Sequence, residues 1–277
     1  MLRLITQYHP ITADPFQRNE NYAETAPCNA LKPYIRCFWG TPEPVRRSGI
    51  ISDKPSLVIP DTCMDIIFHF DYTNNLVDGH FCALDENSYS SSGTGNSALT
   101  STFAIRFYAW TAVLFAENSF AGSKNRAFEV GDYFSALKKE LLPMLMSVTS
   151  LDKRAEFAGD ILLKRLNPNR INANLMNGIS DIICTRGTAK IFDIAQQNAL
   201  SKKHLERVFN ENMGISPKAF SSLVRYQMLW QEICFSPRFN VLDAVEKYGY
   251  SDQSHLLNEF KRRHSMTPKQ AVKFAGK

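Results

Sequence analysis

The last third of the chain holds two stretches that nearly repeat each other. They are IFDIAQQNALSKKHLERVFNENMGISPK at residues 191–218 and VLDAVEKYGYSDQSHLLNEFKRRHSMTPK at residues 241–269. The offset between matching residues is 50 at Asp193 and 51 at Phe209, so the second copy carries one inserted residue. Self-similarity of this kind predicts that one supersecondary unit is built twice.

Each copy is typical of a short helix, a turn, a second helix and the start of a third. A serine such as Ser201, or its neighbour, can cap the second helix. Ser216-Pro217 and Thr267-Pro268 then open third helices, because Ser and Thr cap helices and Pro suits the first helical position. This is the pattern of a helix-turn-helix unit, written twice.

The second helix of such a unit enters the major groove of DNA, and its apolar residues face the core of the unit. The core residues predicted in this way are Leu205, Val208 and Phe209, then Leu256, Leu257 and Phe260. The polar residues left on the outer faces are Lys202, Lys203, Glu206 and Arg207, then Gln253, Ser254, His255 and Asn258. Between the units, a single helix of about 17 residues from Pro217 would span roughly 25 Å.

These residues resemble the AraC/XylS type of transcription regulator, whose hallmark is two helix-turn-helix units joined by a long helix. The matching segments are DIAQQNALSKKHLERVFNENMGISPKAF, Arg225 and YGYSDQSHLLNEFKRRHSMTPKQ, within about the last 100 residues. The sequence departs from the family at Leu229 and Val245, where Ala is usual. Both departures concern helix packing.

The resemblance implies a sequence-specific DNA-binding regulator of transcription that reads two successive major grooves. It implies base contacts from Lys203, Glu206 and Arg207 in the first unit and from Gln253, Ser254, His255 and Asn258 in the second. We expect Lys202 and Arg225 to belong to the same interface. The basic run Lys261, Arg262 and Arg263 is expected near phosphates, which position a protein without specifying sequence.

The distribution of charge agrees with binding to a polyanion. The whole chain carries a formal charge of +5, whereas residues 172–277 alone carry +6 and residues 1–171 carry −1. A basic region behind a nearly neutral one favours double-stranded DNA as the partner of the last third. A scaffold that binds only proteins is disfavoured by the same imbalance.

The first part of the chain is rich in β-branched and aromatic runs separated by breakers, which predicts a mainly antiparallel, small barrel-like β domain. The alternation of Phe103, Ile105 and Phe107 with Ala104, Arg106 and Tyr108 has the period of a strand. The strands are expected at 31–39, 56–59, 64–70, 76–81 and 100–108. The tract 85–97 (DENSYSSSGTGNS) is interpreted as a loop.

Residues 132–147 and 151–166 have helical spacing, and 167–174 (NPNRINAN) has the composition of a linker. We expect an α+β fold: a sensing or assembly domain at 1–130, a helical connector at 131–171 and an all-α domain of two helix-turn-helix units at 172–277. The connector face that carries Phe134, Leu137, Leu141, Phe157 and Ile161 either dimerises or packs on the β domain.

The β domain is also similar, less specifically, to one found in some members of the family, through Pro60, Asp61 and Asp65. The family places a sensing or dimerising module here. The expected partners beyond DNA are therefore a small-molecule effector at this domain, a second copy of the chain and RNA polymerase, with no membrane.

Catalytic and metal-binding motifs are not indicated. The sequence lacks GxSxG, P-loop and GxGxxG patterns, so we expect no enzyme activity and no cofactor. The six cysteines form no CxxC pair, which argues against a disulfide framework or a zinc finger. With no leader or spanning segment in view, a cytoplasmic protein is expected.

Two alternatives stay open for the β domain. It could be a small-barrel enzyme, or a ligand-binding module, fused to a DNA-targeting tail, with Asp61, Asp65 and His69 as its polar centre. A metal site that draws on these residues and on Cys63, His80 and Cys82 is disfavoured, because no tight pair of His or Cys ligands recurs. A turn in which an Asp caps backbone amides explains the same residues.

Overall fold

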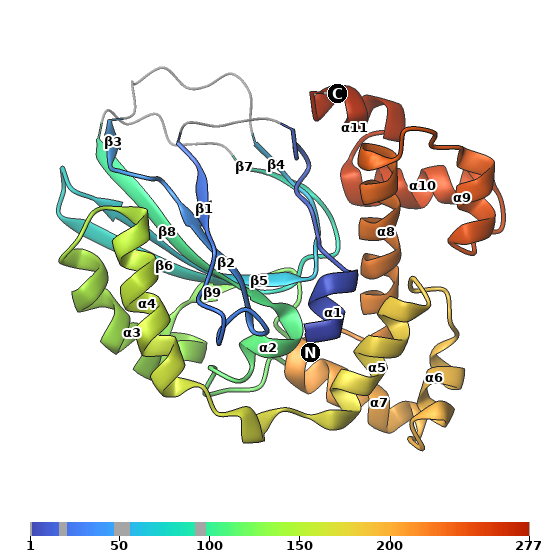
Figure 1. Ribbon diagram of the computed structural model, residues 1–277, viewed down its shortest axis with the longest axis horizontal. Coiled ribbons are helices and arrows are strands. Elements are labelled where there is room, and N and C mark those ends of the chain that lie inside the picture. The colour runs from blue at the N-terminus through green and yellow to red at the C-terminus, as the bar shows by residue number, and fades with distance from the viewer. Residues whose placement is uncertain (1, 17–20, 47–55, 92–97, 277) are drawn as a thin grey trace.

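The computed structural model describes residues 2–16, 21–46, 56–91 and 98–276. The strands come first and the longer helices follow, so the chain forms a sheet-containing N-terminal part and a helical C-terminal part that lie side by side (Figure 1). This confirms the expected α+β class with its antiparallel N-terminal sheet.

Seven strands form one sheet, in the order β1-β2-β8-β5-β6-β9 with β3 paired to β8, and β4 and β7 form a separate pair. Every described pairing is antiparallel. The strands are β1 Ala23–Thr25, β2 Ile35–Gly40, β3 Val45–Arg46, β4 Ser56–Val58, β5 Cys63–Asp71, β6 Leu76–Cys82, β7 Tyr89–Ser91, β8 Leu99–Tyr108 and β9 Ala127–Glu129.

The barrel-like closure expected from the sequence is wrong. Among the described residues, the order of strands runs from β1 to β9 and does not return to β1. Both end strands have only three residues, and helices pack beside them: α4 (Leu151–Arg165) contacts β1, and α3 (Gly131–Met146) contacts β9. A sheet whose edges are short and covered has no need of closure to protect them.

Two local expectations also need correction. The first expected strand begins at Ile35, because residues 31–34 form a turn. The tract 85–97 is not loop throughout, since Tyr89–Ser91 is strand β7, paired with β4. Its residues 92–97 lie outside the described part of the chain. The alternation in β8 is confirmed, because Phe103, Ile105 and Phe107 are fully buried.

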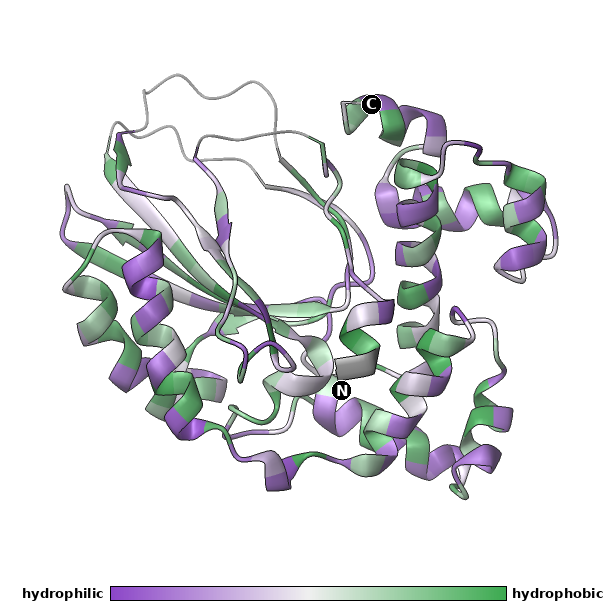
Figure 2. Ribbon diagram, viewed as in Figure 1, coloured by the Kyte–Doolittle hydropathy of each residue, from purple (hydrophilic) through white to green (hydrophobic). Residues whose placement is uncertain are grey.

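The connector forms the two expected amphipathic helices, α3 and α4, with hydrophobic and hydrophilic residues interleaved along each (Figure 2). Phe134, Leu137 and Leu141 have no exposed surface, and they belong to the core that contains the sheet residues. The apolar face of α3 is therefore covered within the chain. Phe157 and Ile161, the α4 residues of the expected face, are only partly buried, so self-association through the connector stays a prediction.

The C-terminal part is entirely helical. Its helices are α5 Ala173–Cys184, α6 Ile191–Gln197, α7 Lys202–Met213, α8 Pro217–Phe235, α9 Val241–Lys247, α10 Gln253–His264 and α11 Pro268–Phe274. Three short helical segments lie earlier in the chain: α1 Leu2–Gln7, α2 Ala109–Ala112 and the 3₁₀ turn Pro168–Arg170. In the described part of the chain, no helix combines the length and the apolar character needed to cross a bilayer.

Helix α8 runs between the two helix-turn-helix units and contributes to two hydrophobic cores (Figure 1). Its first half, with Phe220, Leu223 and Val224, joins the core that also contains the sheet. Its second half, with Leu229 and Trp230, joins a separate core. The first core crosses the boundary expected at residue 172, and the division into separate domains stays a prediction.

Candidate nucleic-acid interface

The first helix-turn-helix unit consists of α6 and α7. The Ser201 hydroxyl accepts a hydrogen bond from the His204 amide at 3.1 Å and caps α7, as expected. At the other end, Gly214 has a φ of +72°, and a Cβ there would lie 2.4 Å from Ser123 Oγ. Only glycine combines this left-handed backbone with so close an approach to the N-terminal domain.

Helix α7 turns its polar face outward. Leu205, Val208 and Phe209 are buried, as predicted from their spacing. The side chains of Lys202 and Arg207 are each 59% exposed, and each lies within 4 Å of a carboxylate one turn further on. Pairs as exposed as these add little to stability and leave the side chains free to exchange partners.

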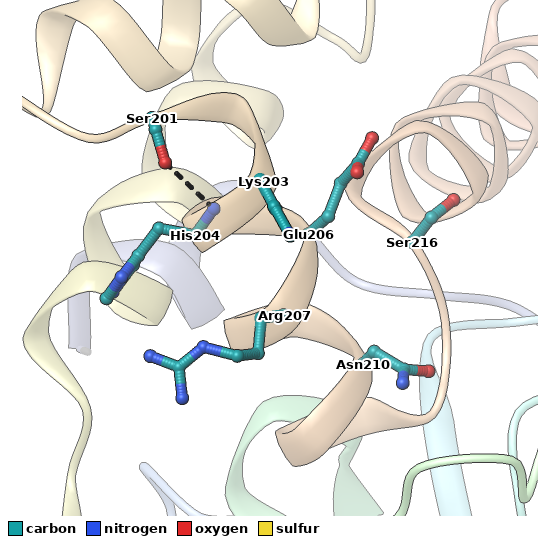
Figure 3. A pocket seen from close by; sticks show the side chains of 7 residues that line it. All are labelled: Ser201, Lys203, His204, Glu206, Arg207, Asn210 and Ser216. Carbon is teal, nitrogen blue, oxygen red and sulfur yellow. Dashed lines mark hydrogen bonds between the residues drawn. The ribbon is translucent and has the colours of Figure 1, made fainter.

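An open hollow of about 680 Å³ lies along this face. Figure 3 shows the residues that line it, with Glu206 pointing toward Ser216 while Arg207 and His204 point to the other side. Lys203 and Asn210 complete the polar lining. The face thus offers cationic, amide and carboxylate groups, which are the side-chain groups that hydrogen-bond to base edges.

The second unit consists of α9 and α10. Asp252, the neighbour of the serine that matches Ser201, caps α10 by accepting a hydrogen bond from the His255 amide at 2.8 Å. Leu256 and Phe260 are fully buried, and Leu257 is partly buried against the same core. The predicted residues Gln253, Ser254, His255 and Asn258 are all exposed, as are Lys261 and Arg262.

A buried carboxylate that the sequence did not single out organises the second unit. Glu259, 8% exposed, accepts hydrogen bonds from Ser222 at 2.5 Å and from Arg225 at 2.8 Å. His255 Nε2 lies 3.8 Å from the same carboxylate. In the sequence, Glu259 stands four residues from both His255 and Arg263, a spacing that indicates contact along one helix face. The partners Ser222 and Arg225 come from α8, and spacing within α10 cannot indicate them.

Arg225 therefore does not join the other predicted interface residues on an outer face. Its side chain is 18% exposed and stacks over the Tyr250 ring at 4.7 Å while it bonds Glu259. The guanidinium connects α8 to α10.

The expectation that Arg263 lies near phosphates is wrong. Its side chain is 3% exposed and donates hydrogen bonds to the Glu86 carbonyl at 2.9 Å and to Ser222 at 2.8 Å. At this position the helix faces its own core and the N-terminal domain. Only Lys261 and Arg262 of the basic run point to the surface.

Of the three polar residues expected to form a centre in the β domain, Asp61 and Asp65 both interact with the charge of Arg106, whereas His69 lies apart. Asp65 accepts three hydrogen bonds from Arg106, at 2.9 to 3.3 Å, and one from Trp39 at 3.0 Å. Asp61 accepts from the Cys63 amide at 2.7 Å, and burial raises the pKa of its carboxyl to about 6. His69 lies four residues along β5 from Asp65, about 13 Å away in a strand.

Metal ligands are not clustered either: the described ranges contain no group of three His, Cys, Asp or Glu side chains that is placed to hold an ion. The six cysteines are all free, and three of them are buried.

Two capped units of this design, each presenting a polar recognition helix, define the class of double helix-turn-helix DNA-binding proteins. Comparison with protein families agrees. Residues 194–273 match a family described as a helix-turn-helix domain, and residues 23–129 match a domain of unknown function, DUF6597. Residues 194–273 therefore form a helix-turn-helix domain of this family.

Among solved structures, similar chains include ToxT from Vibrio cholerae O395, with 13% identity and a TM-score of 0.40 over 86% of this chain and 98% of that one. An AraC-type regulator from Chromobacterium violaceum has 18% identity and a TM-score of 0.33 over 38% and 93%. A probable AraC family regulator from Rhodopseudomonas palustris has 18% identity and a TM-score of 0.34 over 38% and 98%. No curated protein matches the chain.

Proposed function

We propose that α7 and α10 read bases in two successive major grooves of one duplex. The observation that supports this most directly is the pair of exposed polar faces on two helices capped in the same way and joined by α8. That helix has 19 residues and a length of about 29 Å, to which the bodies of the units add. One turn of B-DNA is about 34 Å, so the two faces suit adjacent turns.

The proposal divides the exposed residues by role. Lys203, Glu206 and Arg207 read the first groove, and Gln253, Ser254, His255 and Asn258 read the second. Lys202, Lys261 and Arg262 neutralise phosphates, which makes binding weaker at higher salt. Arg225 acts from inside the protein, because its bond to Glu259 holds α10 in place.

The N-terminal domain supplies sensing or assembly in this proposal. A small-molecule effector, self-association and contact with RNA polymerase belong to it as predictions, as does action without catalysis. A regulator must meet the DNA that it controls, and from this we predict a cytoplasmic location.

The roles of readers and anchors are tested by competition on a set of base-substituted operators, after selection of an operator from random duplexes. Arg207→Ala should cost roughly 1 to 3 kcal/mol on the operator and relax sequence preference at one position. Lys261→Ala should weaken binding to all sequences about equally, and Lys153→Ala on the exposed side of α4 serves as the control. The reverse pattern would mean that the reader and the anchor are exchanged.

The spacing of the two units is tested by footprinting. A single chain should protect two short clusters of base pairs roughly 10 to 11 base pairs apart on one side of the duplex. Insertion of five base pairs between the clusters turns the second to the opposite side, and protection should fall to that of one unit. Undiminished protection of both clusters would contradict simultaneous reading by a fixed pair of helices.

A further inference from the structure

A second hollow, of about 470 Å³, lies on the N-terminal domain where β6 ends and β9 begins, and the two strands pair there through Cys82 and Ala127. The chain that leaves β6 contributes Asp85, Asn87 and Tyr89 to its lining, and the chain that enters β9 contributes Asn125 and Arg126. The volume lies within the range of sites for small molecules.

The two segments around the hollow are cross-linked by hydrogen bonds. The Asn125 side chain accepts from the Glu86 amide at 2.8 Å, and its own amide donates to the Leu84 carbonyl at 2.9 Å. Lys124 and Glu86 form an ion pair at 2.6 Å. The site is therefore preformed, and a ligand need not order its walls at the cost of binding energy.

One charged group in the hollow has no counter-ion. In the described part of the chain, the Asp85 carboxyl makes neither a hydrogen bond nor an ion pair, although it is half-buried. Burial and, second, the charge of Asp61 raise its pKa to about 6. Burial also raises the pKa of the Tyr89 hydroxyl to about 12. Arg126, whose guanidinium stacks over Phe128 at 4.9 Å, forms no ion pair with Asp85 in the described part of the chain.

The same segment holds the second helix-turn-helix unit. The Glu86 carbonyl accepts from Arg263 at 2.9 Å, and the Ser88 and Ser265 hydroxyls lie 2.6 Å apart. A molecule bound to Asp85 and Tyr89 would thus contact the chain neighbours of Glu86 and Ser88, the residues that form hydrogen bonds to the end of α10.

We propose that this hollow binds a small organic cation, with its ammonium or guanidinium group on Asp85 and against the ring of Tyr89, and that binding changes the hold of residues 85–89 on α10. A charge-assisted hydrogen bond and a cation–π contact are the interactions that these two side chains offer. The link to DNA rests on the proposed function, whereas the binding site does not.

The test titrates n-butylammonium chloride into the full chain at constant ionic strength and follows amide NMR shifts. A probe of this size is expected to bind with a Kd of about 1 mM. Shifts should appear at residues 84–89 and 124–127 and extend to Arg263 and Ser265. The neutral 1-butanol and the anionic butyrate should leave these signals unchanged.

Two variants locate the charge. Asp85→Asn should weaken binding of butylammonium about tenfold, because it keeps the shape and removes the charge. Tyr89→Ala should weaken it severalfold through loss of the ring. Asp160→Asn, on the exposed side of α4 and outside the lining, should bind the probe like the unchanged chain.

Other outcomes would refute the cation site, its effect on α10 or the proposed function. Binding of butyrate through Arg126, or no shift above about 10 mM butylammonium, would refute the cation site. Shifts confined to the hollow, with the DNA footprint of the second unit unchanged, would refute the effect on α10. A chain that binds the probe but binds no DNA would refute the proposed function and leave the cation site in place.

Discussion

The two helix-turn-helix units are built from nearly the same pattern, but they attach to the rest of the molecule in different ways. The first shares one hydrophobic core with the β domain, through contacts such as the edge-to-face pair of Trp110 and Phe220. The second has its own core, in which, among the described N-terminal residues, Ala13 and Ile59 are buried and Ile11 and Leu57 are partly buried.

The second unit is held instead by hydrogen bonds, both from the end of α10 to Glu86 and Ser88 and from the half of α8 that joins its core. Gln227 accepts from the Ile11 amide at 2.9 Å and donates to the Pro60 carbonyl at 2.8 Å, and the Trp230 indole donates to the Thr12 carbonyl at 2.9 Å. Shared apolar burial is lost only with the core itself, whereas a few directional bonds are exchanged for water at small net cost. A repeat in sequence therefore does not imply equal attachment of its copies.

The largest effect should come from truncation of the ring that joins the first unit to the β domain. Phe220→Ala removes a fully buried side chain and should cost about 3 to 5 kcal/mol of unfolding free energy. Amide hydrogen exchange should speed up in β8 and α7 together. Phe260→Ala, an equally buried ring in the second unit, should speed exchange more around α10 than in β8. Unchanged exchange in β8 after Phe220→Ala would contradict the claim that the first unit and the β domain share one core.

The second largest effect is expected from acid, which should destabilise the second unit more than the first. His264, fully buried in the second unit, occupies the position that Met213 has in the first, and burial lowers its pKa to about 4. The unfolded chain, with a histidine pKa near 6.5, takes up the proton first, so stability from this group is complete above about pH 6.5 and lost as the pH falls toward 4. The loss at the second unit is on the order of 3 kcal/mol.

This acid effect is measured by hydrogen exchange of α10 against α7 between pH 7 and pH 4. His264→Gln, which cannot titrate, should abolish the difference in pH dependence. Equal pH dependence of both helices in the unchanged chain would show that another group controls it.

The smallest effect is expected where the second unit meets residues 11–13. Gln227→Ala leaves the Ile11 amide and the Pro60 carbonyl without partners and should cost about 1 to 3 kcal/mol. Exchange at Ile11 should accelerate while α7 stays protected. Gln197→Ala, at an exposed position in the first unit, is the control. Slower exchange at Ile11 than in the unchanged chain would contradict the role of Gln227 as a tether.

The sequence predicted the parts of the fold that depend on local rules. The caps at Ser201, Ser216 and Thr267 all form, because they require only a side chain and amides two or three residues further on. The long helix after Pro217 ends two residues beyond its predicted end at Ile233. The buried residues of α7 also followed from their spacing.

Features that depend on distant partners were not predictable in this way. Arg263 has the composition of a solvated helix end, yet its neighbours are Ser222 and Glu86, 41 and 177 residues away in the chain. The three-residue strand β9 exists because Phe128 meets Phe81, and nothing in its own sequence marks a strand. The open edge of the sheet likewise depends on helices that pack beside it.

Helix α8 lies in both cores, with its first half in one and its second half in the other. A helix is stiff over such a length, since each backbone hydrogen bond depends on its neighbours. The free energies of the two cores are therefore coupled, and loss of either one frays the helix that the other needs. The chain should melt in a single cooperative transition, although it contains two cores.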